Sequence, residues 1–212
     1  MNSDPHRGQP ILGRGPDPAT ARLTILCVHG RGASAADILA LADEFGVADV
    51  AYLAPEAAGR TWYPNSFLAP MSDNEPFLSS AFGVLDRIVH DLWQDHQIGP
   101  ERVGLLGFSQ GACLSLEYAA RHAQRYAAVV GLSGALIGPP GTPREYAGAM
   151  DGTPVFLGCS DVDPHIPLGR VHETAAAFRR LGASVDERIY PGMGHQVNRD
   201  EIAAVTRLLT AA

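Results

Sequence analysis

Short apolar runs alternate with longer amphipathic stretches along almost the whole chain. Runs typical of buried strands fall at 23–28, 50–54, 103–108, 127–132, 155–157 and 184–190. Stretches whose apolar positions recur with helical spacing fall at 35–45, 78–93, 112–122, 168–181 and 201–209. This alternation predicts an α/β fold with a mainly parallel sheet and helices on both faces. In such sheets, ligand chemistry takes place at the carboxyl ends of the strands.

Two long stretches interrupt this alternation, at residues 55–76 and 133–154. Connections of that length in a compact domain are usually either functional or mobile. The first contains Trp62, Tyr63 and Phe67. We expect the two stretches to wall a substrate pocket. The alternative is that the aromatic side chains of the first stretch only seal the edge of the core.

The length of 212 residues suits a single domain. Residues 1–20 are polar and contain several Pro and Gly, so we expect a flexible N-terminal arm there and one folded domain over residues 21–212. The arm lacks the apolar core of a secretory signal. No apolar run approaches the ~20 residues that would span a bilayer. These features favour a cytoplasmic protein.

Composition excludes several classes of function. The net charge is −7 and all 16 basic residues are Arg, scattered along the chain, which argues against binding to nucleic acid. The absence of Lys excludes a pyridoxal Schiff base and a P-loop lysine. The cysteines lack the paired spacing of a metal site and are expected to be buried and reduced: Cys27, Cys113 and Cys159. We therefore expect no cofactor and no metal.

The most informative motif is Gly-x-Ser-x-Gly at residues 107–111. It lies between an apolar run and a helical pattern, so it predicts a strand, a sharp turn and a helix. Such a turn exposes the hydroxyl of Ser109 above the sheet, as nucleophilic catalysis requires. Gly107 and Gly111 lack a β-carbon, which allows the strand and the helix to approach each other closely. The alternative is that this glycine-flanked serine lies in an ordinary turn and has no catalytic role.

A serine hydroxyl needs a neutral imidazole to take its proton and a carboxylate to orient that imidazole. His195 is our candidate base, because it ends a Gly-rich turn between a predicted strand and the last helix. Asp163 is our candidate acid, because Pro164 holds it in an extended conformation after the strand at 155–157. Asp161 is the alternative acid, although it could simply cap the turn. His165 is a rival base but lies close to Asp163 in sequence.

Acyl transfer also requires hydrogen-bond donors aimed at the oxygen that becomes negative. We expect one donor to be the backbone N–H of Gln110, directly after the nucleophile. The second donor is expected from the Gly-containing turn at residues 29–32, where we nominate the N–H of Arg31. If the Arg31 side chain faces the pocket, it would favour acidic or polar substrates through charge-assisted hydrogen bonds.

Together, the motifs at residues 29–32, 107–111, 161–167 and 192–195 resemble those of the phospholipase/carboxylesterase family of α/β-hydrolases. The resemblance covers nearly the whole chain from about Leu23, with the motifs in the family's order. It implies an α/β-hydrolase sheet and metal-free hydrolysis of esters or thioesters by Ser109, His195 and Asp163. It favours Asp163 over Asp161, because the family has an Asp-Pro pair at this position. The expected substrate pocket comprises Trp62, Tyr63, Phe67, His165 and Met193.

The sequence thus predicts a serine hydrolase that acts on a small-molecule ester or thioester through an acyl-enzyme. A peptidase or amidase on the same fold is the first alternative, since pocket contacts rather than the triad set specificity. A catalytically silent hydrolase-like binding protein is the second. A third alternative is chemistry like that of dienelactone hydrolases. Ser109 argues against it, because that chemistry usually requires a cysteine at this position. The sequence does not determine the oligomeric state, and we allow for a homodimer. We expect no membrane span.

Overall fold

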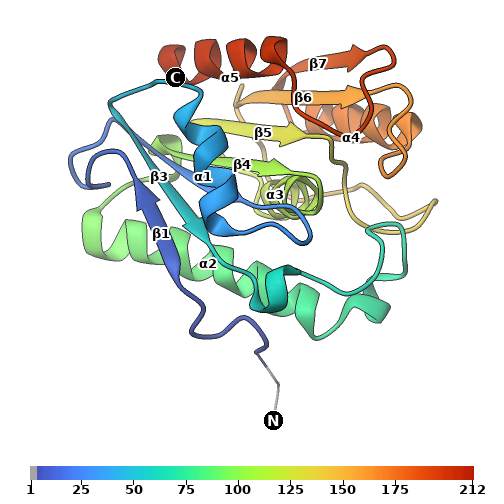
Figure 1. Ribbon diagram of the computed structural model, residues 1–212, viewed down its shortest axis with the longest axis horizontal. Coiled ribbons are helices and arrows are strands. Elements are labelled where there is room, and N and C mark those ends of the chain that lie inside the picture. The colour runs from blue at the N-terminus through green and yellow to red at the C-terminus, as the bar shows by residue number, and fades with distance from the viewer. Residues whose placement is uncertain (1–3) are drawn as a thin grey trace.

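The computed structural model describes residues 4–212 and contains one seven-stranded sheet (Figure 1). Its strand order is β1-β3-β2-β4-β5-β6-β7, with β1 antiparallel to β3 and every other neighbouring pair parallel. The strands are β1 (Ile11–Arg14), β2 (Leu23–Val28), β3 (Val50–Pro55), β4 (Val103–Phe108), β5 (Ala128–Leu132), β6 (Pro154–Ser160) and β7 (Ser184–Tyr190). The α-helices are α1 (Ala35–Asp43), α2 (Phe77–His96), α3 (Gln110–Arg121), α4 (Leu168–Arg180) and α5 (Arg199–Ala211).

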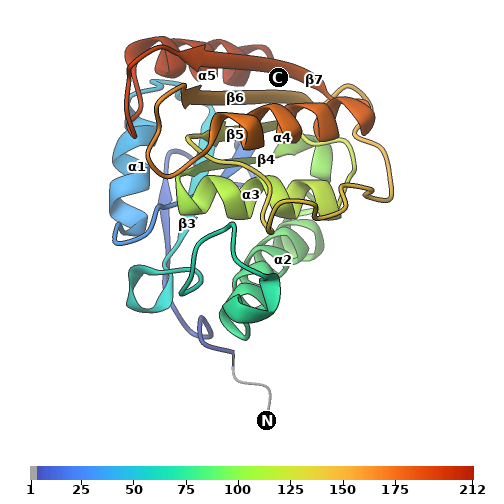
Figure 2. The ribbon, with the colours of Figure 1, turned by 90° about the vertical axis from the view of Figure 1, so that its right-hand side faces the viewer.

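Helices cover both faces of this sheet, as the sequence predicts (Figures 1 and 2). Successive residues of a strand point to opposite faces. Leu26 and Leu105 accordingly pack in the core under α2, α3 and α4, whereas Ile25 and Leu106 pack in the core under α1 and α5. The central strands are therefore buried on both sides and are almost entirely apolar, with Thr24 of β2 as a buried polar exception. No helix within residues 4–212 combines the length and the apolarity that crossing a bilayer requires.

The parallel register brings the carboxyl ends of the strands to one edge of the sheet. Val28 pairs with Gly107 across β2 and β4, and Phe108 pairs with Leu132 across β4 and β5. The turns that carry Ser109, Asp163 and His195 leave from the ends of β4, β6 and β7. Residues far apart in the chain therefore meet where the alternating pattern predicts ligand chemistry.

The N-terminal segment differs from the flexible arm expected for residues 1–20. Residues 1–3 of that arm lie outside the described part of the chain, but Ile11–Arg14 forms β1 and pairs with β3 at the edge of the sheet. Without β1, the outer N–H and C=O groups of β3 would lack partners. The side chains of Ile11 and Leu12 are 49% and 40% exposed, so β1 leaves no burial pattern in the sequence.

Candidate active site

Ser109 occupies a strained turn between β4 and α3. Its backbone has φ 56° and ψ −120°, a conformation that residues with a side chain rarely adopt. Two hydrogen bonds hold it there: the Ser109 N–H donates to the carbonyl of Leu132 at 2.9 Å, and its own carbonyl accepts from the N–H of Cys113 at 3.0 Å. The surrounding sheet and helix thus fix the serine in this geometry.

The two glycines of the motif allow this turn to close. A β-carbon added to Gly107 would lie 2.3 Å from the carbonyl oxygen of Gly111. A β-carbon on Gly111 would lie 2.0 Å from the carbonyl oxygen of Val28. Both distances are far below van der Waals contact, so any side chain at either position would push α3 away from the ends of β4 and β2. The sequence therefore needs glycine at both positions.

Ser109, His195 and Asp163 form one continuous chain of hydrogen bonds. The Oγ of Ser109 lies 2.8 Å from Nε2 of His195, and Nδ1 of His195 lies 2.7 Å from Oδ2 of Asp163. Because an ionised carboxylate only accepts hydrogen bonds, we assign the ring proton to Nδ1. Nε2 is then free to accept the proton of the serine hydroxyl, which is the arrangement of a general base.

Asp163 lies in a site that keeps its carboxylate charged. Its side chain is fully buried, and burial alone would raise its pKa. The hydrogen bond from His195 and those from the backbone N–H groups of His165 and Ile166 outweigh that effect and hold the pKa below its usual value. The Cys159 thiol, 3.8 Å from Oδ2, is a further weak donor to the same oxygen.

The turn that carries His195 is attached to the loop that carries Asp163. Gly192 and Gly194 have φ of 68° and 80°, where a side chain would be strained. Asp161 accepts a hydrogen bond from the N–H of Gly192 at 2.8 Å, and the Ser160 hydroxyl accepts one from the N–H of Gly194 at 3.1 Å. Asp161, the alternative acid of the sequence analysis, thus holds the histidine turn and lies outside the Ser109–His195 chain.

Aromatic rings fix the orientation of the His195 imidazole. The ring of Phe108 lies 5.1 Å from it, between centroids, and the ring of His165 lies 4.8 Å away in an edge-on arrangement. His165, the rival base, therefore packs against His195, and within residues 4–212 it makes no hydrogen bond to Ser109. The His195 side chain is only 18% exposed.

Arg31 and Gln110, from which the sequence analysis expects oxyanion donors, line the same cavity as Ser109. A β-carbon on Gly30 would lie 3.3 Å from Cβ of Ser109, which places the turn at residues 29–32 directly against the serine. Gln110 is the first residue of α3, where backbone N–H groups have no acceptor inside the helix. Among residues 4–212, neither the Arg31 N–H nor the Gln110 N–H donates to another protein group.

A cavity of about 490 Å³ opens above Ser109. Of the five expected pocket residues, Tyr63, Phe67 and His165 line it, together with Ser109 and His195. Trp62 and Met193 lie outside its lining. Trp62 is fully buried, and its indole N–H donates to the carbonyl of His29 at 2.9 Å. The sulfur of Met193 contacts the amide of Asn198 instead of the cavity.

The side chains of Arg31 and Gln110 bind the backbone of the first long connection, residues 55–76, beside the cavity. The sequence did not predict these contacts. The Arg31 guanidinium donates to the backbone carbonyls of Tyr63, Pro64 and Asn65 at 2.9, 2.8 and 2.6 Å. The Gln110 amide accepts from the N–H of Trp62 and donates to the carbonyl of Tyr63. These bonds join a side chain to a distant backbone, so no motif spacing could have signalled them.

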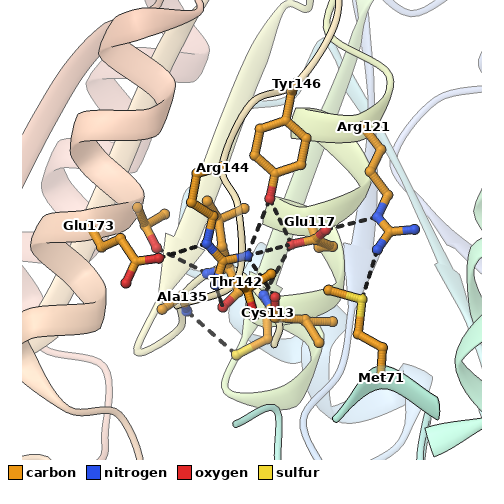
Figure 3. Close-up of polar contacts among 12 residues, drawn as sticks. Met71, Cys113, Glu117, Arg121, Ala135, Thr142, Arg144, Tyr146 and Glu173 are labelled. Atoms are coloured by element: carbon orange, nitrogen blue, oxygen red, sulfur yellow. Dashed lines mark hydrogen bonds and ion pairs between the residues drawn. The ribbon is translucent and has the colours of Figure 1, made fainter. Parts of the chain in front are cut away.

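The second long connection, residues 133–154, contributes no residue to the cavity lining within the described chain, contrary to expectation. A buried polar cluster fastens it to α3 and α4 instead (Figure 3). The carboxylate of Glu117 accepts hydrogen bonds from the Ile137 N–H, the Tyr146 hydroxyl and the Arg121 side chain. Arg144 donates to Glu173 at 2.6 Å and to the carbonyl of Ile137 at 2.7 Å. This connection therefore braces the helix that begins beside Ser109.

The three cysteines take no part in the contacts that join Ser109, His195 and Asp163. All three are buried and free, and burial raises the pKa of both Cys113 and Cys159 to about 12. Cys113 lines the cavity one turn after Ser109, with its sulfur accepting from the Ala135 N–H at 3.4 Å. In residues 4–212, no three His, Cys, Asp or Glu side chains cluster in a way that could hold a metal ion.

The sheet and the hydrogen-bonded serine, histidine and aspartate define the class of α/β-hydrolases. The model of the phospholipase/carboxylesterase family matches residues 16–212. The chain belongs to this family. A solved structure of a phospholipase/carboxylesterase from Dyadobacter fermentans is 35% identical and superimposes with a TM-score of 0.91, covering 96% of this chain and 97% of the other.

Curated proteins with similar sequences carry related names. A putative esterase, NocK, from Nocardia uniformis is 30% identical over 85% of this chain and 56% of its own length. Acyl-protein thioesterase 1 from Saccharomyces cerevisiae is 28% identical over 61% of this chain and 57% of its own length. The matched part of the chain thus spans little more than half the length of these curated relatives.

Proposed function

We propose that the protein is a serine hydrolase that cleaves carboxylic esters or thioesters through an acyl-enzyme. The observation that carries the proposal is the unbroken chain from Ser109 through His195 to Asp163, with contacts of 2.8 and 2.7 Å. A hydroxyl is a weak nucleophile unless an adjacent base accepts its proton. A buried carboxylate that orients the base completes the requirement.

The reaction follows from the positions of these groups. The Oγ of Ser109 attacks the carbonyl carbon while Nε2 of His195 takes the hydroxyl proton. The carbonyl oxygen becomes negative and accepts hydrogen bonds from the N–H groups of Arg31 and Gln110, each typically worth ~3 kcal/mol. His195 then returns the proton to the departing alcohol or thiol. A water molecule, deprotonated by the same nitrogen, releases the acid from Ser109.

The cavity and the relatives bear on the substrate. A volume of about 490 Å³ suits a small-molecule ester or thioester, with Tyr63 and Phe67 as apolar walls. The thioesterase name of the yeast relative supports testing thioesters beside oxygen esters. We also propose that the protein works in the cytoplasm and does not bind nucleic acid. A homodimer remains an expectation, which sedimentation would test.

Substitution of the nucleophile tests the proposal. Ser109→Ala should reduce hydrolysis of a short p-nitrophenyl ester by about 10⁴-fold or more, because no other group can form the acyl-enzyme. Ser115→Ala on the same helix is the matched control, since Ser115 is buried and its hydroxyl has no hydrogen-bond partner in the described chain. Activity that survives in folded Ser109→Ala would rule the proposal out.

A further inference from the structure

His6 lies ten residues before the part of the chain that matches the family, yet its side chain is built into the first long connection. The residue is only 1% exposed. Its Nδ1 accepts a hydrogen bond from the N–H of Ala58 at 3.1 Å, and its Nε2 donates to the carbonyl of Trp62 at 2.9 Å. The imidazole therefore bridges the two ends of residues 58–62.

The backbone of His6 is anchored on α2. The His6 N–H donates to the Ser80 hydroxyl at 2.9 Å. The carboxylate of Asp4 accepts from the same hydroxyl and from Arg87, the latter at 3.2 Å. The His6 ring packs against Phe77, the first residue of α2, at 5.9 Å between ring centroids. Helix α2 thus anchors the backbone of His6, and the His6 imidazole in turn anchors residues 58–62.

Trp62 carries this contact onward to the nucleophile. Its indole packs against two histidine rings, 5.3 Å from His6 and 5.1 Å from His29 between centroids. The backbone N–H of Trp62 donates to Oε1 of Gln110 at 2.9 Å, and Gln110 directly follows Ser109 in the chain. The other end of the Gln110 amide donates to the carbonyl of Tyr63, which lines the cavity. A displaced Trp62 would therefore disturb the cavity wall at Tyr63, whereas the Gln110 N–H stays fixed by the backbone at the start of α3.

Both histidines around Trp62 fit this role only as neutral rings. The Nδ1 of His6 accepts from Ala58, and the Nε2 of His29 accepts from the N–H of Ala57 at 3.1 Å. A protonated ring would turn each acceptor into a donor facing another donor. Burial lowers the pKa of both side chains, which favours the neutral form.

We propose that His6 is a positioning residue for the ester or thioester hydrolysis proposed above, on which this inference rests. By fixing residues 58–62, it holds Tyr63 in the wall of the cavity and Trp62 against the Gln110 side chain. It touches neither substrate nor the reacting atoms. Its loss should therefore weaken substrate binding more than the intrinsic reactivity of Ser109.

The experiment compares His6→Ala, His6→Gln and His90→Ala in the full chain. Two readouts are needed: KM and kcat for a short p-nitrophenyl ester, and the rate at which a small fluorophosphonate labels Ser109. We expect His6→Ala to raise KM about fivefold or more and to change the labelling rate by less than about twofold. His6→Gln should restore KM, because a side-chain amide can accept from Ala58 and donate to Trp62. His90 is exposed on α2, and its substitution should change nothing.

An unchanged KM in folded, normally labelled His6→Ala would overturn the role of His6 and leave the proposed function intact. If His6→Ala does not fold, Ser80→Ala decides, because it removes the hydroxyl that anchors both the His6 backbone and Asp4 and leaves the His6 imidazole in the chain. A KM raised about two- to threefold in that variant would support the role, and an unchanged KM would overturn it. Absence of both labelling and turnover in the wild-type protein would overturn the proposed function itself, and this role with it.

Discussion

At the scale of single residues, the site depends on Ser109 being held in an unfavourable backbone conformation. Gly107, Gly111 and the hydrogen bond to Leu132 maintain this conformation. The sequence predicted that Ser109, His195 and Asp163 meet, because each follows a strand within a Gly- or Pro-marked turn. Such local signals are visible in a single chain. The contacts of His6 and of the Gln110 side chain leave no such signal, because each meets the backbone of a distant segment.

Arg31 offers a prediction at this scale. Its guanidinium already donates to three loop carbonyls, so we expect Arg31→Leu to loosen the cavity wall rather than remove a charge filter. Hydrolysis of a neutral ester and of a carboxylate-bearing ester of equal length should fall by a similar factor, about fivefold. The measurement is kcat/KM for the matched pair. A selective loss of the carboxylate ester would instead show that Arg31 recognises negative charge.

At the scale of elements, the apolar pattern located five helices and six strands of the described chain and missed one strand, β1. The predicted elements are long enough, or buried enough, for periodicity to report their burial. β1 has four residues that are all exposed and is held by backbone hydrogen bonds to β3, which periodicity does not record. The walls of the cavity were predicted only in part for a similar reason. Residues 55–76 and 133–154 have no repeating pattern, so their positions depend on specific polar contacts.

Helix α5 carries a testable pH dependence of stability. Glu201, near its start, is fully buried, and within residues 4–212 only one of its carboxylate oxygens has a partner, the N–H of Asn198 at 2.8 Å. Burial raises the pKa of Glu201 from 4.5 to about 7. A raised pKa in the folded state means that this group's stabilisation is complete below pH 4.5 and is lost as pH rises through 7.

Glu201→Gln keeps the acceptor for Asn198 and removes the charge. We expect it to raise the free energy of unfolding at pH 8 by roughly 1 to 3 kcal/mol and to change it little below pH 5. Urea denaturation at the two pH values measures this difference, with exposed Glu44→Gln as the control. Equal effects of Glu201→Gln at both pH values would show that the carboxyl ionises freely in the folded protein.

At the scale of the whole molecule, the buried cluster around Glu117 joins α3, α4 and the second long connection (Figure 3). Glu117→Leu would leave the buried Arg144 side chain without this neighbouring carboxylate. We expect the free energy of unfolding to fall by about 3 to 5 kcal/mol. Arg121→Leu removes a half-exposed partner of the same carboxylate and should cost about 1 kcal/mol or less. Similar losses in both variants, measured in urea, would contradict a structural role for the buried cluster.

The sheet as a whole brings together the side chains of Ser109, Asp163 and His195. Ser109 and His195 are 86 positions apart in the chain. The central claim is that this assembly makes one hydroxyl reactive. The most direct measurement is the rate and position of fluorophosphonate labelling, mapped by mass spectrometry, in wild type, His195→Gln and the exposed control His90→Gln. We expect labelling at Ser109 alone, slowed about 10³-fold or more in His195→Gln and little changed in His90→Gln. Labelling at another residue, or an unchanged rate in His195→Gln, would contradict the account.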